Sequence, residues 1–292
     1  MLKRFRSGNS TDSAVQTATP ARPQLELSGP HLKEALGSML GVCEPGGGAE
    51  RYVEALIFKA SIFQDAFSPD SGPMTLQRFL RLCMFMPTVR RKAHIYFTSD
   101  RCDEILTTLP ILLDKQASPS DRLSAFVSNF PDDKPHRWVR DLGAEILHNI
   151  DPERCPAMMR WVWDSDSNTG VIREIWHDDQ VDHITIPLDD EIETFLMLRE
   201  ELAQYLTENG IFRDVLWYVD LLCGHIYARY LAAQGGTLLR TEFSNPSEDL
   251  GMHTRRILGL DGVRAKGDTA RELERLESDS AIMKQLESIQ EG

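Results

Sequence analysis

The sequence FRDVLWYVDLLCGHIYARYLAA, residues 212–233, decides the fold class of this chain. Apolar residues recur in it every three to four positions, the spacing of one face of an α-helix: Val215, Val219, Leu222, Ile226 and Tyr230. Further large apolar residues fill its other faces: Leu216, Trp217, Tyr218 and Leu221. A helix that is apolar nearly all round is usually the buried centre of a helical domain. We therefore predict a mainly α-helical fold built around this segment.

The same periodicity predicts helices along most of the chain before this segment. They are expected from Ser28 to before Gly46, over 50–67, from 76 to before Pro87, and over 99–115, 118–129, 135–149 and 189–209. Ser28 with Pro30, and Ser118 with Pro119, are typical of helix starts, because a capping hydroxyl is followed by proline in the first turn.

One β-hairpin is predicted inside this helical chain, over about residues 169–187. Residues 171–177 and 181–187 are rich in β-branched and aromatic side chains. Within each segment, these side chains roughly alternate with polar ones. The three residues Asp178, Asp179 and Gln180 would join the two strands. This pattern is typical of two antiparallel strands with a short connection.

The two ends of the chain have a different composition from the middle. Residues 1–27 are rich in Ser, Thr, Ala, Gln and Pro, which predicts a disordered N-terminal arm. Residues 28–244 form the predicted helical globular domain with its hairpin. Residues 245–292 are predicted to be a polar linker followed by a charged helix over 269–290. That helix has a thin apolar stripe, so we expect it to dock on the body, pair with a partner helix or fray.

Composition narrows the class of protein. The net charge of −13 and the pI of about 5.1 make sequence-independent binding to nucleic acid unfavourable. The five cysteines are scattered and form no CxxC pair, so we expect reduced, mostly buried thiols. No window approaches the ~18 uninterrupted apolar residues of a membrane span. These features together indicate a cytoplasmic protein.

The richest cluster of polar residues lies at the predicted hairpin tip. His177, Asp178, Asp182 and His183 would meet where the two strands lie side by side. Imidazole and carboxylate are common ligands of Zn²⁺, Mn²⁺ and Fe²⁺. One interpretation is a divalent-metal site for hydrolysis, and the other is an acidic, solvated turn. The sequence requires no cofactor, and it leaves open whether a divalent metal ion binds at this cluster.

A repeated E-x-x-H pattern is also present, at Glu145 to His148 and at Glu174 to His177. Two such pairs face inward in helical di-iron proteins. The second pair falls in a predicted strand here, so we do not expect a di-iron site.

Two further groups of residues are candidate sites. Asp220 and His225 are polar residues in the apolar segment 212–233, so each needs a partner, either in a pocket with shifted pKa values or in a structural hydrogen bond. A basic group could bind an anion or an acidic partner, or be a mixed surface face; it comprises Arg78, Arg81, Arg90, Arg91 and Lys92.

Two functional hypotheses follow from these patterns. The leading one is a non-catalytic accessory protein that binds a protein partner through its helical body and charged C-terminal helix. It is motivated by the lack of a Walker, GxSxG or HExxH motif in the sequence. The alternative is a metal-dependent, hydrolase-like enzyme centred on the hairpin tip. The sequence leaves open whether the chain is an enzyme, its oligomeric state and the identity of its partner.

Overall fold

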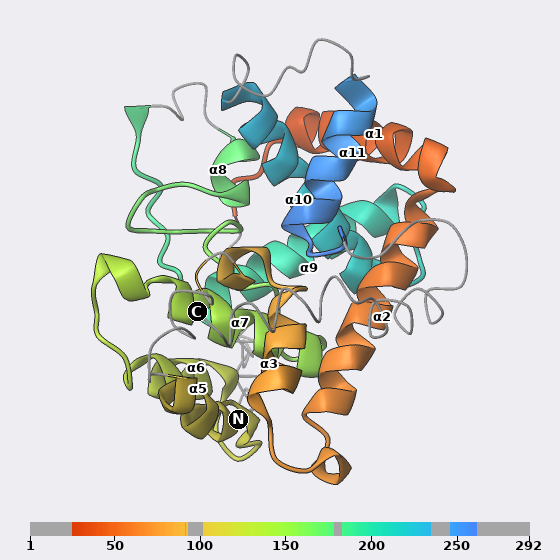
Figure 1. The fold of residues 1–292 in the computed structure, drawn as a ribbon. Helices are drawn as coiled ribbons and strands as arrows, with labels where there is room; N and C mark the ends of the chain where they lie inside the picture. The colour runs from red at the N-terminus through yellow and green to blue at the C-terminus, as the bar shows by residue number, and fades with distance from the viewer. Residues whose placement is uncertain (1–24, 91, 93–101, 178–182, 235–245, 262–292) are drawn as a thin grey trace, which may run out of the picture.

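A computed structural model describes residues 25–90, 92, 102–177, 183–234 and 246–261 of the chain. This part of the protein is mainly helical, as predicted (Figure 1). Within the described residues, no helix has the length and apolar character needed to cross a membrane.

The predicted central helix is α10, Val215–Gln234. Its middle is buried, including Val219, Leu222 and Ile226 of the predicted stripe. Helices α1 (Gly29–Cys43), α2 (Ala49–Ala66), α8 (Val171–Glu174), α9 (Ile192–Glu208) and α11 (Pro246–Ile257) contact it. Phe212 lies before the first turn and is 73% exposed, so the buried segment is shorter than the apolar run. The prediction of a buried central helix is confirmed.

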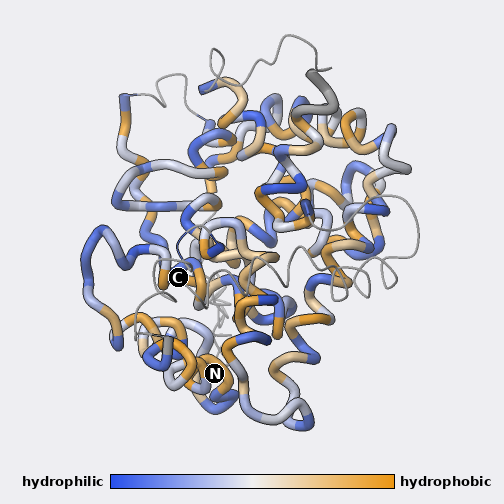
Figure 2. The backbone as a smooth tube through the Cα atoms, viewed as in Figure 1, coloured by the Kyte–Doolittle hydropathy of each residue, from blue (hydrophilic) through white to orange (hydrophobic). Residues whose placement is uncertain are grey.

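The remaining helices are α3 (Leu76–Cys83), α5 (Cys102–Thr108), α6 (Pro119–Val127) and α7 (Trp138–Ile150), with short 3₁₀ turns at Glu44–Gly46, Pro69–Ser71, Leu109–Leu113 and Lys134–His136. Helix α7 contacts α2 and α6, whereas α3 contacts α2 and α5 contacts the 3₁₀ turn Leu109–Leu113. Figure 1 shows α5 and α6 at one end of the molecule and α1, α8 and α11 at the other. Figure 2 shows that apolar and polar positions alternate along most helices, as two-faced packing requires.

The predicted helix starts at Ser28 and Ser118 are confirmed. The Ser28 hydroxyl accepts a hydrogen bond from the His31 amide, and the Ser118 hydroxyl accepts one from the Asp121 amide. Each bond satisfies an amide that has no partner within its helix. The break between the first two helices lies at Gly47 and Gly48, whose φ angles of 97° and 93° favour glycine.

The predicted hairpin over 169–187 is not confirmed. Residues 171–174 form the short helix α8, and no strand is present among the described residues of this region. Trp176 makes an isolated antiparallel bridge with Leu27, a residue placed in the predicted N-terminal arm. Leu25, from the same arm, is buried. The central residues of the predicted tip, 178–182, lie outside the described residues, as do 1–24.

The C-terminal region differs from the prediction of a polar linker, because residues 246–257 form α11. The helix ends in a glycine motif: the Leu260 amide donates to the Arg255 carbonyl and the Gly259 amide to the Arg256 carbonyl. Leu258 packs so closely on Gly224 of α10 that a Cβ atom at residue 224 would lie 2.7 Å from it. This region therefore belongs to the packed body. The predicted charged helix over 269–290 lies outside the described residues.

Candidate functional site

A cluster of polar side chains, most of them ionisable, is buried where α2, α7 and α10 meet. It consists of Lys59 from α2, Glu145, His148 and Asn149 from α7, and Asp220 from α10. The three α7 residues are spaced i, i+3 and i+4, so they share one face of the helix. We call these five residues the central polar cluster.

The first half of the central polar cluster is a buried ion pair. Lys59 Nζ lies 3.0 Å from Glu145 Oε2 and also donates to the Leu258 carbonyl at 3.1 Å. Asn149 Nδ2 donates to the same Glu145 oxygen at 3.2 Å. The Lys59 side chain therefore joins α2 to α7 and to the residue that follows α11.

The second half is a histidine between two acceptors. His148 Nε2 lies 3.0 Å from Asp220 Oδ2, and its Nδ1 lies 2.9 Å from the Cys155 carbonyl oxygen. Burial lowers the pKa of His148, but the charge and hydrogen bond of Asp220, together with the Cys155 carbonyl and the Glu145 charge, outweigh that effect, so the pKa is raised. Asp220, predicted as a pocket candidate, thus has a specific buried partner.

A cavity of about 20 Å³ lies beside the central polar cluster. Trp161, Trp217 and Leu56 form part of its apolar wall. This volume fits about one water molecule, since a water needs roughly 10–15 Å³ measured in this way. In this conformation the ionisable groups are held against each other, and the cavity has no room for a substrate.

His225, the other predicted pocket residue, lies in a separate buried site. Its Nε2 is 2.9 Å from Ser38 Oγ of α1, and its Nδ1 is 3.3 Å from Thr254 Oγ1 of α11. Because the Thr254 hydroxyl donates to the Leu250 carbonyl, it accepts from Nδ1–H of a neutral ring. Burial, reinforced by the charge of Arg229, lowers the pKa of His225 to about 4. His225 therefore joins three helices as an uncharged group.

We expect acid to destabilise the fold through His225. Its pKa is about 4 in the folded protein and near 6.5 in an unfolded chain, so below pH 6.5 the unfolded chain binds the proton first. The contribution of His225 to stability is full above pH 6.5 and falls by ~3 kcal/mol as the pH drops to about 4. Urea unfolding of His225→Gln should lack this part of the loss, whereas a control at the exposed His31, His31→Gln, should keep it. Parallel pH profiles for wild type and His225→Gln would contradict the assignment.

The predicted metal ligands are only partly within the described residues. His177 and His183 are exposed, and the His177 amide donates to the Glu26 carbonyl. Asp178 and Asp182 lie outside the described residues. Among the residues that are described, no group of three or more His, Cys, Asp or Glu side chains is arranged to hold a metal ion. The structure does not bring the two E-x-x-H pairs together. Glu145 and His148 belong to the buried central polar cluster, whereas His177 is exposed.

The members of the predicted basic group have different structural roles. Arg78 donates to the carbonyls of Ala66, Ser71 and Pro73, so it stabilises the turn between α2 and α3. Arg90 makes a bidentate pair with Asp261, at 2.9 and 2.6 Å.

The other three members of the basic group lie at or near the surface or outside the described residues. Lys92 is exposed and Arg81 is half-buried. Arg91 lies outside the described part of the chain. An anion site at this group stays a prediction.

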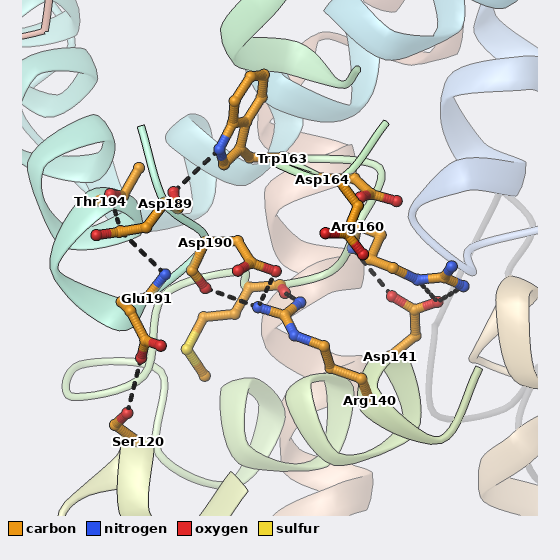
Figure 3. A network of polar contacts seen from close by, with 12 residues as sticks. Ser120, Arg140, Asp141, Arg160, Trp163, Asp164, Asp189, Asp190, Glu191 and Thr194 are labelled. Atoms are coloured by element: carbon orange, nitrogen blue, oxygen red, sulfur yellow. Dashed lines mark hydrogen bonds and ion pairs between the residues drawn. The ribbon is translucent and has the colours of Figure 1, made fainter. Parts of the chain in front are cut away.

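A second polar network, shown in Figure 3, fixes the loops around α7 and α9. Arg160 bonds the buried Asp141 carboxylate through Nε at 3.1 Å and Nη2 at 2.7 Å. Arg140 donates to the Asp190 carbonyl at 2.7 Å, and Trp163 Nε1 donates to the Asp189 carbonyl at 3.0 Å. These bonds link segments that are distant in sequence. Each donor binds an acceptor within the protein itself.

A larger groove of about 300 Å³ lies between α1, α8 and α10. Its floor includes Ala35, Ile175 and Ile226. At its rim, Arg229 of α10 pairs with Glu34 of α1. The groove has the volume of a small ligand.

Sequence reasoning identified Asp220 and His225 as polar residues that need partners, and it named Glu145 and His148 only within the E-x-x-H pattern. It missed Lys59, and it did not pair any of these groups. The signal that could have found Lys59 was a single cationic residue among the apolar residues Leu56, Ile57 and Ala60.

Comparison with protein-family models, curated proteins and solved structures finds no match to this chain.

Proposed function

We propose that this chain is a non-catalytic accessory protein that binds a protein partner through its C-terminal segment, residues 262–292. The observation that carries the proposal is the composition of residues 269–290. They are mostly charged or polar, but a thin stripe of apolar residues recurs at helical spacing: Leu273, Leu276, Met283, Leu286 and Ile289. A helix with so narrow a stripe gains little stability alone and more against a partner surface.

The body supports this proposal by providing a firm attachment for the segment. Asp261, the last described residue, is held by two bonds from Arg90, and the Leu258 carbonyl is held by Lys59. The segment therefore begins at a point tied to both α2 and the residues after α3. Such an arrangement suits a scaffold that presents a binding segment.

The central polar cluster is consistent with a scaffold role as well. Its charged groups contact each other and the cavity beside them fits about one water, so the cluster supplies contacts between helices. Removing one member of a buried ion pair of this kind is costly, because the other charge then stays buried without a partner.

The test is a comparison of four forms of the protein: the full chain, a truncation and two double variants. The truncation after Asp261 keeps α11 and the motif that ends it. The double variant Leu276→Asp, Met283→Asp disrupts the stripe, and the matched control Ala281→Asp, Ser288→Asp adds the same charge on another face of such a helix. Each form is used for affinity purification with mass-spectrometric identification, and each recovered protein is then purified and titrated directly.

We expect the truncation and the stripe variant to bind the identified partner at least ~10-fold more weakly, because each buried apolar side chain contributes ~1.5–3 kcal/mol and ~1.4 kcal/mol is tenfold. The control should bind as the full chain does. Equal binding by all four forms would remove the segment from the proposal. Sedimentation of the pure protein distinguishes a second copy of the chain from a different partner.

A further inference from the structure

We propose that His148 carries a proton on both ring nitrogens in the folded protein at neutral pH, and that its ion pair with Asp220 is a pH-sensitive tie between α7 and α10. This inference concerns the fold itself and does not depend on the proposed function.

The geometry requires one proton on Nδ1 and a second between Nε2 and the Asp220 carboxylate. The Cys155 carbonyl can only accept, so Nδ1, at 2.9 Å, must carry hydrogen. Nε2 lies 3.0 Å from an oxygen of the Asp220 carboxylate, which also accepts when ionised. Without a proton between them, two lone pairs would face each other in a buried site. The pair is attractive only while it holds that proton.

The surrounding charges favour placing the proton on the imidazole. On α7, the Glu145 carboxylate adds negative potential one turn before His148, and on α10 Asp220 is the direct partner. On α2, the Lys59 charge is directed at Glu145. Around the Cys155 thiol, charges of both signs are present: Arg122, Asp151, Arg154 and Arg199. Together with the hydrogen bond to the Cys155 carbonyl, the carboxylates outweigh the burial of the ring, and the pKa of His148 is raised.

The direction of the pH effect follows from this shift. A histidine whose pKa is raised on folding contributes stability that is fully present below about pH 6.5 and is lost as the pH rises through the folded value. Above that value, the unprotonated Nε2 and the Asp220 carboxylate repel each other. The contact between α7 and α10 is then weakened at the wall of the small cavity.

The decisive measurement is the ¹⁵N NMR spectrum of the histidine rings in the wild-type protein at about pH 7.5. We expect both nitrogens of His148 to have the shifts of an imidazolium. His225, which is neutral at this pH, provides an internal control with one unprotonated nitrogen. The His148 signal is assigned by its contact with Trp217, whose ring centroid lies 6.0 Å away, or by its loss in His148→Gln. An unprotonated nitrogen on His148 at this pH would overturn the proposal.

Variants separate the proton from a purely steric role. In Asp220→Asn the amide oxygen can still accept, but the charge is gone, so His148 should lose one proton at pH 7.5. Urea midpoints between pH 6.5 and 8 should fall with pH in the wild type and be flatter in His148→Gln. Buried thiols such as Cys83 and Cys223 cause a separate loss near pH 9 that both proteins share. Equal slopes below pH 8 would contradict the tie.

Discussion

Replacing Lys59 by methionine should lower the free energy of unfolding by about 3–5 kcal/mol, which is the usual cost of removing one member of a buried ion pair. The side chains of Lys59 and Glu145 are only 5% and 3% exposed, so the substitution leaves the Glu145 carboxylate buried without its cation. Glu145 Oε2 would keep Asn149 as a donor, and the Leu258 carbonyl would lose the Lys59 bond. Urea unfolding at neutral pH measures this change.

The control for Lys59→Met is an exposed pair on the same helix. Arg51 and Glu54 of α2 are 3.3 Å apart, but their side chains are 51% and 59% exposed. Arg51→Met should therefore cost less than ~1 kcal/mol. The double variant Lys59→Met, Glu145→Met should recover much of the loss, because no uncompensated charge stays buried. Similar losses for Lys59→Met and Arg51→Met would contradict the buried pair.

The second large effect is expected at Gly259, in the motif that ends α11. Its φ angle is +71°, and a Cβ atom there would lie 1.9 Å from the Phe85 carbonyl oxygen. Gly259→Ala should therefore combine left-handed backbone strain, ~1–2 kcal/mol, with a steric displacement worth ~1–3 kcal/mol. The contacts of Lys59 with the Leu258 carbonyl and of Arg90 with Asp261 lie on either side and should weaken as well. Thermal unfolding and hydrogen exchange of α11 amides measure this effect.

Gly210 is the matched control for this substitution. It also has a positive φ angle, +92°, but a Cβ atom at residue 210 would have no other atom within 4 Å. Gly210→Ala should show the backbone strain alone and leave α11 protected from exchange. If both variants lose the same stability, the close approach of residue 259 to Phe85 does not hold in solution.

The helical fold class could be predicted because apolar periodicity is a local property. The apolar stripe of α10 and the capping hydroxyls of Ser28 and Ser118 can be recognised from the residues of each helix and those next to it. The hairpin prediction was not confirmed because a short run of β-branched residues suits either structure. In the fold, residues 171, 172, 175 and 176 are all buried, which is helical spacing and not alternation.

For the candidate site, in contrast, the sequence indicated some of the residues but not the groups that they contact. Asp220 and His225 stand out in sequence because a polar side chain in an apolar helix needs a partner. The partners are His148 for Asp220, and Ser38 and Thr254 for His225. They come from other helices, so no local pattern around residues 220 and 225 could identify them.

By itself, the amino-acid sequence determined that this protein is built from helices and that α10 is buried at its centre. Only the tertiary structure decided which charges are neutralised and by which groups, since Lys59 lies 86 residues from Glu145 and His148 lies 72 from Asp220. The physical reason is that helix formation depends on neighbours along the chain. The pairing of buried charges depends on which helix faces meet when the apolar stripes pack together.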